Sequence, residues 1–256
     1  NTTANLNWVS YKARGWNDPH VVGYMESHDE DRIGFECKTY GNSAPNHNIK
    51  SLPVAMQRIA MLKNLLYTVP GPKMLWQFGE LGYDFPINYC ENGTINPDCR
   101  TSPKPIRWDY FANPERRKLH DVTAALLTLR KNHDVFETTD FQLNISSGQV
   151  RSIFLNDADL NVAVFANIGV TATTVNNPPF QHVGQWYEYY TGDTLLVTSG
   201  PPTTFSLAPG EYRLYLDKYV AVPPGLVFSS TQEVRGALEF FEVRPNPVQD
   251  NFALYF

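Results

Sequence analysis

The first part of the chain alternates between short apolar runs and a segment whose apolar residues recur at helical spacing. Val21–Ser27 begins with continuous apolar residues and ends polar, which predicts a strand buried on both faces of a parallel sheet. Ser51 is the expected N-cap of a helix that stops at Pro70–Pro72. The apolar residues of this helix are Leu52, Ala55, Ile59, Leu62 and Leu66. A second apolar run, Lys73–Phe78, follows, so the predicted order is strand, helix, strand.

A further amphipathic helix is predicted after Asn113 and Pro114. It ends at the basic pair Arg130 and Lys131, which suits a helix C-terminus. Its apolar face carries Leu119, Val122, Leu126 and Leu129.

From residue 135 to residue 217 the pattern changes to short alternating segments separated by turn residues. The segments are FQLNI, SIFL, NVAVFANI, QWYEYY, TLLV, TTFSL and EYRLYL. About seven strands at this spacing predict an antiparallel β-sandwich. Residues 220–225 include AVPPG and are expected to form a linker. The pattern that follows is again typical of strands and stops at Phe256 without a turn. The chain also begins at Asn1 rather than at Met, so we expect a fragment of a longer protein.

Composition and charge narrow the function classes. The 256 residues are 42% hydrophobic and carry 21 Lys and Arg against 26 Asp and Glu, with a net charge of -5. Because no block of basic residues is present, a nucleic-acid partner is not expected. No apolar run reaches the roughly 18 to 20 residues that a membrane-spanning helix needs.

The cysteines leave two readings open. Cys90 and Cys99 bracket the turn-rich stretch ENGTINPD and can close a small loop in an oxidising compartment, or both can remain free thiols, as Cys37 does in either case.

The length of the α/β region argues against a complete barrel. A closed eight-stranded β/α barrel needs at least about 200 residues, whereas residues 1–134 supply two clear strands. The region is therefore either the last quarter of a barrel or part of a smaller sheet.

Candidate chemistry lies at the end of the first predicted strand, in the stretch YMESHDEDR. His28 and Asp29 follow the strand directly, and α/β sheets and barrels bind their ligands at this end of their strands. An imidazole beside a carboxylate can bind sugar hydroxyls, and the carboxylate can stabilise a cationic transition state. Alternatively, the two side chains only hydrogen-bond each other and cap a loop.

The sequence resembles the α-amylase family of glycoside hydrolases, family 13. YMESHDEDR is similar to the motif that ends the seventh barrel strand of that family, and PGPKMLWQFGELGYD, residues 70–84, is similar to its eighth-strand segment. The resemblance implies an α/β fold, namely the C-terminal part of a TIM (β/α)8 barrel with strands seven and eight in residues 1–134. It also implies the antiparallel sandwich in residues 135–219, because that family places a sandwich directly after its barrel.

The resemblance also implies roles for individual residues. Asp29 would be the catalytic carboxylate that stabilises the oxocarbenium-like transition state, and His28 would bind hydroxyls of the sugar. Arg32 and Glu80 are assigned to substrate binding, and an ion-pair role is the alternative for both, as it is for Glu26. Trp76 and Tyr83 can stack on sugar rings, although Trp76 on a buried strand is expected in the core.

Other parts of the family pattern are missing or different. The nucleophile and the general acid of a retaining mechanism belong to strands four and five, and we find neither before Val21, so we expect this chain alone to be catalytically inactive. Ser27 and Glu30 stand where many members have Asn, which is closer to branching enzymes, so hydrolysis and transglycosylation both remain open. No metal-binding motif is present and no cofactor is expected, while calcium dependence stays undecided.

The end of the chain resembles a second family. VRPNPVQDNF, Val243–Phe252, is similar to the opening of the C-terminal sorting domain of type IX secretion, and a plain turn is the alternative. Residues 220–256 would then be a linker and a truncated sorting domain. The resemblance implies bacterial outer-membrane export, with the protein secreted or held at the cell surface and the secretion machinery as a partner.

Two further hypotheses concern partners. The sandwich is rich in aromatic residues at Trp186, Tyr187, Tyr189 and Tyr190, so a non-catalytic glucan-binding or surface module is an alternative to an enzyme. The partial barrel should expose strand edges and apolar helix faces, so we also expect the missing N-terminal barrel segment to be a partner and the isolated chain to associate.

Overall fold

The structure is a computed structural model of the chain and describes residues 2–222 and residue 226. The predicted linker extends beyond these residues, and the Val243–Phe252 motif lies wholly outside them. The α-helices are α1 (Ile33–Tyr40), α2 (Leu52–Tyr67) and α3 (Pro114–Asn132). Short 3-10 helices are η1 (Asn7–Val9), η2 (Lys12–Arg14), η3 (Gly79–Leu81), η4 (Pro97–Cys99), η5 (Trp108–Ala112) and η6 (Asp134–Glu137).

The strands form one large antiparallel sheet and two small ones. The strands are β1 (Ser43–Ala44), β2 (His47–Asn48), β3 (Phe141–Asn144), β4 (Val150–Leu155), β5 (Val162–Asn167), β6 (Thr173–Asn176), β7 (Gly184–Glu188), β8 (Thr194–Val197), β9 (Thr204–Leu207) and β10 (Tyr212–Leu216). The large sheet has the order β3-β4-β5-β10-β7-β8, while β6 pairs with β9 and β1 with β2. Every segment predicted as a strand between residues 135 and 217 is confirmed, and β6 was not predicted.

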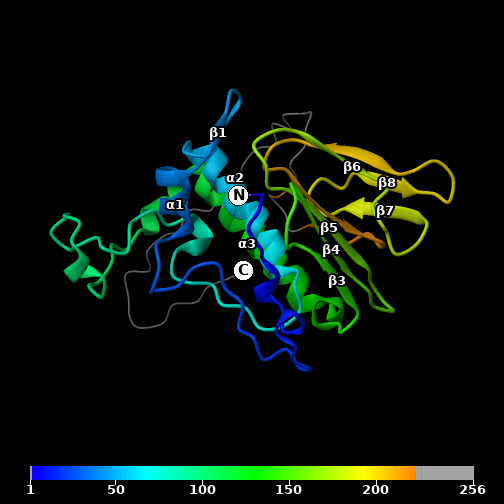
Figure 1. The fold of residues 1–256 in the computed structure, drawn as a ribbon, viewed down its shortest axis with the longest axis horizontal. Coiled ribbons are helices and arrows are strands. Elements are labelled where there is room, and N and C mark those ends of the chain that lie inside the picture. The colour runs from blue at the N-terminus through cyan, green and yellow to red at the C-terminus, as the bar shows by residue number, and fades with distance from the viewer. Residues whose placement is uncertain (1, 223–225, 227–256) are drawn as a thin grey trace, which may run out of the picture.

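The large sheet is covered on both faces. Alternation along β5 points Val162 and Val164 toward α2 and α3, and points Ala163 and Phe165 toward the β6–β9 pair. Figure 1 shows the helices gathered on one side of these strands. The helices and the sheet therefore share one hydrophobic core, and the second, smaller core lies inside the sandwich.

The helix predictions for α2 and α3 are confirmed, with one correction at a cap. Asn113 caps α3 through its side-chain oxygen, which accepts hydrogen bonds from the backbone of Glu115 at 3.0 Å and of Arg116 at 3.2 Å. Ser51 precedes α2 but makes no capping bond, because its hydroxyl donates to the carbonyl of Asn48 at 2.8 Å. Helix α1 was not predicted, since of its residues only Gly34 is buried and no apolar stripe marks it.

The prediction of two full parallel strands is wrong for the described residues. Val21–Ser27 and Lys73–Phe78 meet only at a single parallel bridge between Gly23 and Lys73. The backbone N–H of Gly23 donates to Pro72 O at 2.9 Å, and that of Met74 donates to Gly23 O at 3.0 Å. An isolated pair of strands is marginal, and parallel pairing is less stable per residue than antiparallel pairing. The two segments do lie side by side in the predicted direction.

Candidate functional site

The His28–Asp29 pair lies on the surface at the end of the first bridged segment. Nε2 of His28 is 3.5 Å from Oδ2 of Asp29, and both side chains are 68% exposed. The Asp29 backbone N–H donates to the hydroxyl of Ser27 at 3.1 Å, and Ser27 itself is buried. Ser27 therefore shapes the turn that presents the pair to solvent.

A cleft of about 290 Å³ opens beside this pair. It is lined by residues of the His28 segment, of the Trp76 segment and of the loop that follows Tyr83. The two motifs singled out in the sequence thus meet at one site, together with a loop that neither motif includes.

Glu26 and Arg32 form the support beneath the pair. The Glu26 carboxylate accepts the backbone N–H of Ile33 at 2.9 Å and lies 3.5 Å from Nε of Arg32, with both side chains 8% exposed. Arg32 also donates to the carbonyl of Gln77 and lies over the ring of Tyr83. A β-carbon at position 79, where the chain has glycine, would collide with the Glu26 carboxylate, so the two motifs pack directly against each other. Arg32 lines the cleft from this buried position, in the ion pair that the sequence left open.

Glu80 is not among the lining residues of the cleft. Its charge acts on Lys63 and Tyr67 of α2, on the inner side of the molecule. Burial lowers the pKa of Lys63 to about 8, and the charges of Glu26 and Glu80 partly oppose that shift. Direct contact between Glu80 and a ligand in the cleft stays a prediction.

The two aromatic candidates for sugar stacking, Trp76 and Tyr83, differ in how accessible their rings are. Trp76 is half-buried rather than in the core, lines the cleft, and has its ring centroid 5.4 Å from that of His28. Tyr83 is buried, stacks on Phe78, and donates from its hydroxyl to the carbonyl of Pro105 at 2.8 Å. Of these two rings, Trp76 is therefore the one placed to stack on a ligand.

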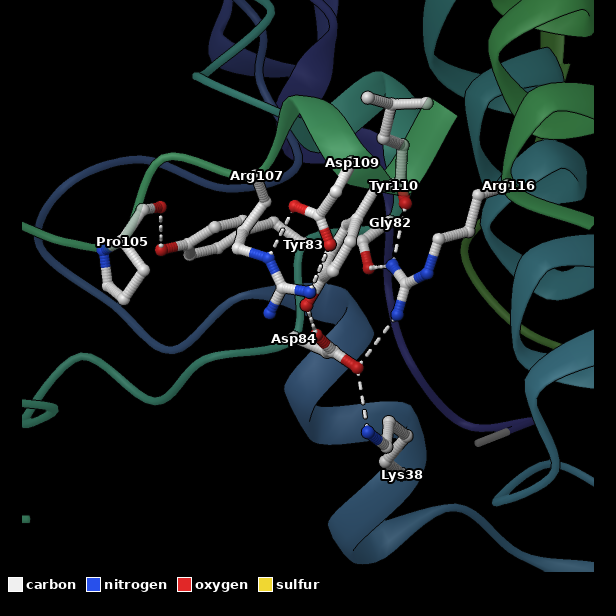
Figure 2. Close-up of polar contacts among 10 residues, drawn as sticks. Lys38, Gly82, Tyr83, Asp84, Pro105, Arg107, Asp109, Tyr110 and Arg116 are labelled. Atoms are coloured by element: carbon white, nitrogen blue, oxygen red, sulfur yellow. Dashed lines mark hydrogen bonds and ion pairs between the residues drawn. The ribbon is translucent and has the colours of Figure 1, made fainter. Parts of the chain in front are cut away.

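A buried ion-pair cluster holds the turn behind Tyr83. Asp84 accepts from Lys38 at 2.7 Å and from Arg116 at 2.9 Å, and also accepts the hydroxyl of Tyr110 (Figure 2). Arg116 lies 3.6 Å from the Tyr110 ring centroid. Burial favours the neutral form of Asp84, but hydrogen bonds from Lys38 and Tyr110 and the Arg116 charge outweigh it and lower the pKa of Asp84. The cluster ties α1, α3 and η5 to this turn.

Sequence reasoning missed the loop that completes the cleft. Cys90 and Cys99 are joined by a disulfide, the pairing that the sequence left open. Immediately after this bridge, Arg100 donates a hydrogen bond to the backbone carbonyl of Asp29, and Lys104 also lines the cleft. The turn-rich spacing between the cysteines was the available signal, but it carried no information about where the loop packs.

Three of the four sandwich aromatics singled out in the sequence are core residues. Trp186 is 0% exposed, and Tyr189 and Tyr190 are each 3% exposed. Strand β7 ends at Glu188, so Tyr190 does not continue its alternation and packs with Tyr189 against the helices. These three rings are therefore not a sugar-binding platform, and Tyr187 alone among the four is half-buried.

A larger groove of about 1000 Å³ lies between α2, α3 and the β7 and β10 strands. Its buried carboxylate, Glu188, accepts the backbone N–H groups of Tyr190, Thr191 and Leu214. Arg213 at its rim pairs with Glu211 at 2.8 Å. These charged groups are engaged within the protein.

The described residues contain neither a clustered metal site nor a membrane-spanning helix. Within residues 2–222, no group of three or more His, Cys, Asp or Glu side chains is arranged to hold a metal ion. No helix in the described part of the chain has the length and apolar character needed to cross a bilayer.

The comparisons with known proteins rest on structure. No family model matches the chain, and no curated protein matches its sequence. AmyP solved with maltose is similar with a TM-score of 0.60 and 18% identity, covering 77% of this chain and 41% of that one. The α-amylase of Geobacillus thermoleovorans, solved with acarbose, gives a TM-score of 0.59 and 16% identity, covering 82% of this chain and 42% of that one. CldA, a cyclomaltodextrin glucanotransferase, gives a TM-score of 0.55 and 16% identity, covering 82% of this chain and 39% of that one.

The likeness at these identities is one of fold. This chain spans about two fifths of the length of those solved chains. The helices and the antiparallel sandwich of this chain therefore have the same fold as part of the solved α-amylase and glucanotransferase chains.

Proposed function

We propose that this chain is the C-terminal part of an α-glucan-active glycoside hydrolase of the α-amylase type. The observation that carries the proposal is the exposed His28–Asp29 pair at the mouth of a cleft that Trp76 also lines. The shared fold with proteins solved with maltose and with acarbose supports an oligosaccharide as the ligand.

The chemistry of the cleft suits a neutral sugar. The Asp29 carboxylate is placed to stabilise positive charge that develops at an anomeric carbon, and His28 to bind sugar hydroxyls. Trp76 offers an apolar ring face for the pyranose. Charges of both signs line the cleft, namely Asp29, Glu30, Arg32, Arg100 and Lys104, and Arg32 is already paired with Glu26, so the cleft is not biased toward a charged ligand.

The rest of the reaction is assigned to other parts of the parent protein. A retaining mechanism needs a nucleophile and a general acid about 5 to 5.5 Å apart. In the proposal both come from strands four and five of a barrel, and the bridged segments Val21–Ser27 and Lys73–Phe78 correspond to its strands seven and eight. The sandwich at 135–219 follows the barrel, and the tail at 220–256 directs export to the cell surface or medium.

Hydrolysis and transglycosylation are both compatible with this site. Glu30 lines the cleft next to Asp29, while Ser27 is used to hold the turn. The presence of a glucanotransferase among proteins of the same fold supports keeping transfer as the alternative activity. Analysis of the products separates the two, because hydrolysis raises the number of reducing ends and branching leaves it unchanged.

The test replaces Asp29 by Asn in the full-length protein. Loss of one electrostatic stabiliser of a transition state costs roughly 10² to 10³ in kcat, so starch turnover should fall by that factor with an unchanged melting temperature. Asp159→Asn is the matched control, since Asp159 is an exposed carboxylate on a sandwich turn outside the cleft. Normal turnover in the Asp29 variant would refute the proposal.

The purified 256-residue chain provides a second test. It should release no reducing ends from soluble starch, because Asp29 alone supplies neither nucleophile nor proton donor. Cleavage by this chain that Asp29→Asn abolishes would show that the other two carboxylates lie within it.

A further inference from the structure

The loop at residues 86–104 is cross-linked at its own base. The Cys90–Cys99 disulfide closes it, with the two α-carbons 5.2 Å apart. Nζ of Lys104 donates to the carbonyl of Tyr89 at 2.9 Å and to that of Cys99 at 2.6 Å, so it ties both sides of the loop together. In Figure 1 the blue-green tip of this loop projects from the helical side of the molecule.

The base of the loop is docked on the segment that carries Asp29. The Asp31 carboxylate accepts the backbone N–H of Ile87 at 2.7 Å. Two residues earlier, the carbonyl of Asp29 accepts a hydrogen bond from Nη2 of Arg100. These two contacts hold the turn from Asp29 to Asp31 from the loop side.

The position of Asp29 depends on such backbone contacts. Among the described residues, its carboxylate pairs with the His28 ring, which is itself 68% exposed and gives little support. Its N–H is held by Ser27 and its carbonyl by Arg100. Arg100 follows Cys99 directly and is the C-cap of η4, so the disulfide constrains the backbone from which its side chain extends.

We propose that the disulfide-closed loop is the second wall of the saccharide site and that Arg100 is a positioning residue for Asp29. The proposal rests on the function proposed above and deepens it. Arg100 acts through the backbone of Asp29, and Thr101 and Ser102 beside it also line the cleft. A displaced carboxylate stabilises the transition state less well, while most contacts to bound glucan persist, so the effect falls on kcat rather than KM.

The experiment compares Arg100→Ala, Arg100→Lys and Arg117→Ala in the full-length protein with a maltooligosaccharide substrate. Arg117 is the matched control, because it is also exposed and donates to a backbone carbonyl, that of Phe111 at 3.2 Å, away from the cleft. We expect Arg100→Ala to lower kcat by about tenfold, with KM changed by less than about twofold and the melting temperature unchanged. Arg100→Lys keeps one donor and should recover part of kcat. A kcat for Arg100→Ala within about twofold of wild type, in a protein that Asp29→Asn inactivates, would overturn the inference.

A second measurement separates failure of the inference from failure of the proposed function. Absence of glucan turnover, or normal turnover in Asp29→Asn, refutes the proposed function. Amide hydrogen exchange over residues 27–32 of this chain then decides separately whether Arg100 and the disulfide hold the Asp29 turn. Faster exchange in Arg100→Ala and in the Cys90→Ala/Cys99→Ala double variant than in Arg117→Ala supports it, and equal exchange overturns it.

Discussion

The Asp84 cluster offers a direct test of how the Tyr83 turn is held. Asp84 and Arg116 have side chains 6% and 7% exposed, whereas Lys38 is 48% exposed. Replacing Asp84 by Ala leaves the Arg116 guanidinium buried without its carboxylate partner, while Lys38 can return to water.

The expected cost follows from these contacts. Breaking a buried ion pair by removing one partner costs about 3 to 5 kcal/mol. Arg116 retains hydrogen bonds to the carbonyls of Leu81 at 2.7 Å and Gly82 at 2.6 Å and its contact with the Tyr110 ring. We therefore expect the lower end, about 3 kcal/mol, which lowers the melting temperature by about 6 to 12 °C in a protein of this size.

Thermal unfolding of the 256-residue chain, followed by circular dichroism, measures this effect. Asp109→Ala is the control within the same region, because Asp109 pairs with Arg107 at 2.5 Å but its side chain is 63% exposed (Figure 2). Its removal should leave the melting temperature nearly unchanged. A decrease of less than about 2 °C for Asp84→Ala, or equal decreases in both variants, would refute the reasoning.

The pH dependence of stability gives a second readout of the same cluster. Because the pKa of Asp84 is lowered below its usual 3.8, the folded protein binds this proton more weakly than the unfolded chain does. The stabilisation is therefore present above that value and is lost as the pH falls through the folded pKa. The stability of the Asp84→Ala variant should therefore depend less on pH in this acidic range than the stability of the wild type does.

Two other predictions concern the core and a buried histidine. Trp186→Ala should lower the free energy of unfolding by about 3 to 5 kcal/mol in urea titrations, because the ring is fully buried against Phe180; a near-neutral result combined with weaker retention in starch gels would favour the binding-module hypothesis. Burial and then the Arg58 charge lower the pKa of His47 below 6.5, since Nε2 of His47 lies 3.0 Å from Nε and 2.8 Å from Nη2 of Arg58. The neutral His47 side chain therefore contributes its full stabilisation above pH 6.5, and this contribution falls as the pH drops through the pKa of His47 in the folded protein. His47→Gln should reduce the difference in melting temperature between neutral and mildly acidic pH, and an unchanged difference would contradict the assignment.

The helices and the sandwich strands were largely predictable because their signals are local. An apolar stripe at helical spacing defines α2 and α3, and period-two alternation defines seven of the strands from β3 to β10. Strand β6 escaped detection because its sequence, TTVN, buries only Val175. Helix α1 escaped because its one buried residue is a glycine.

The parallel segments show where local patterning misleads. A continuous apolar run predicts a strand only if neighbouring strands accept and donate its hydrogen bonds. In the described residues, Val21–Ser27 and Lys73–Phe78 have just each other, so one bridge forms in place of a ladder. The direction and neighbourhood of the two segments were nevertheless foreseen from the order of the motifs.

The division between local and tertiary information is clearest at the site. His28 and Asp29 are consecutive residues directly after an apolar run, so the pair could be identified without coordinates. The contact between Arg100 and Asp29 joins residues 71 positions apart, and the burial of Trp186 requires the β6–β9 pair to cover the second face of the sheet. Periodicity indicates which face of an element is apolar, but it does not indicate which distant loop or sheet will pack against that face. Only the packed chain could therefore decide that a disulfide-closed loop borders the cleft and that Trp186, Tyr189 and Tyr190 are core residues.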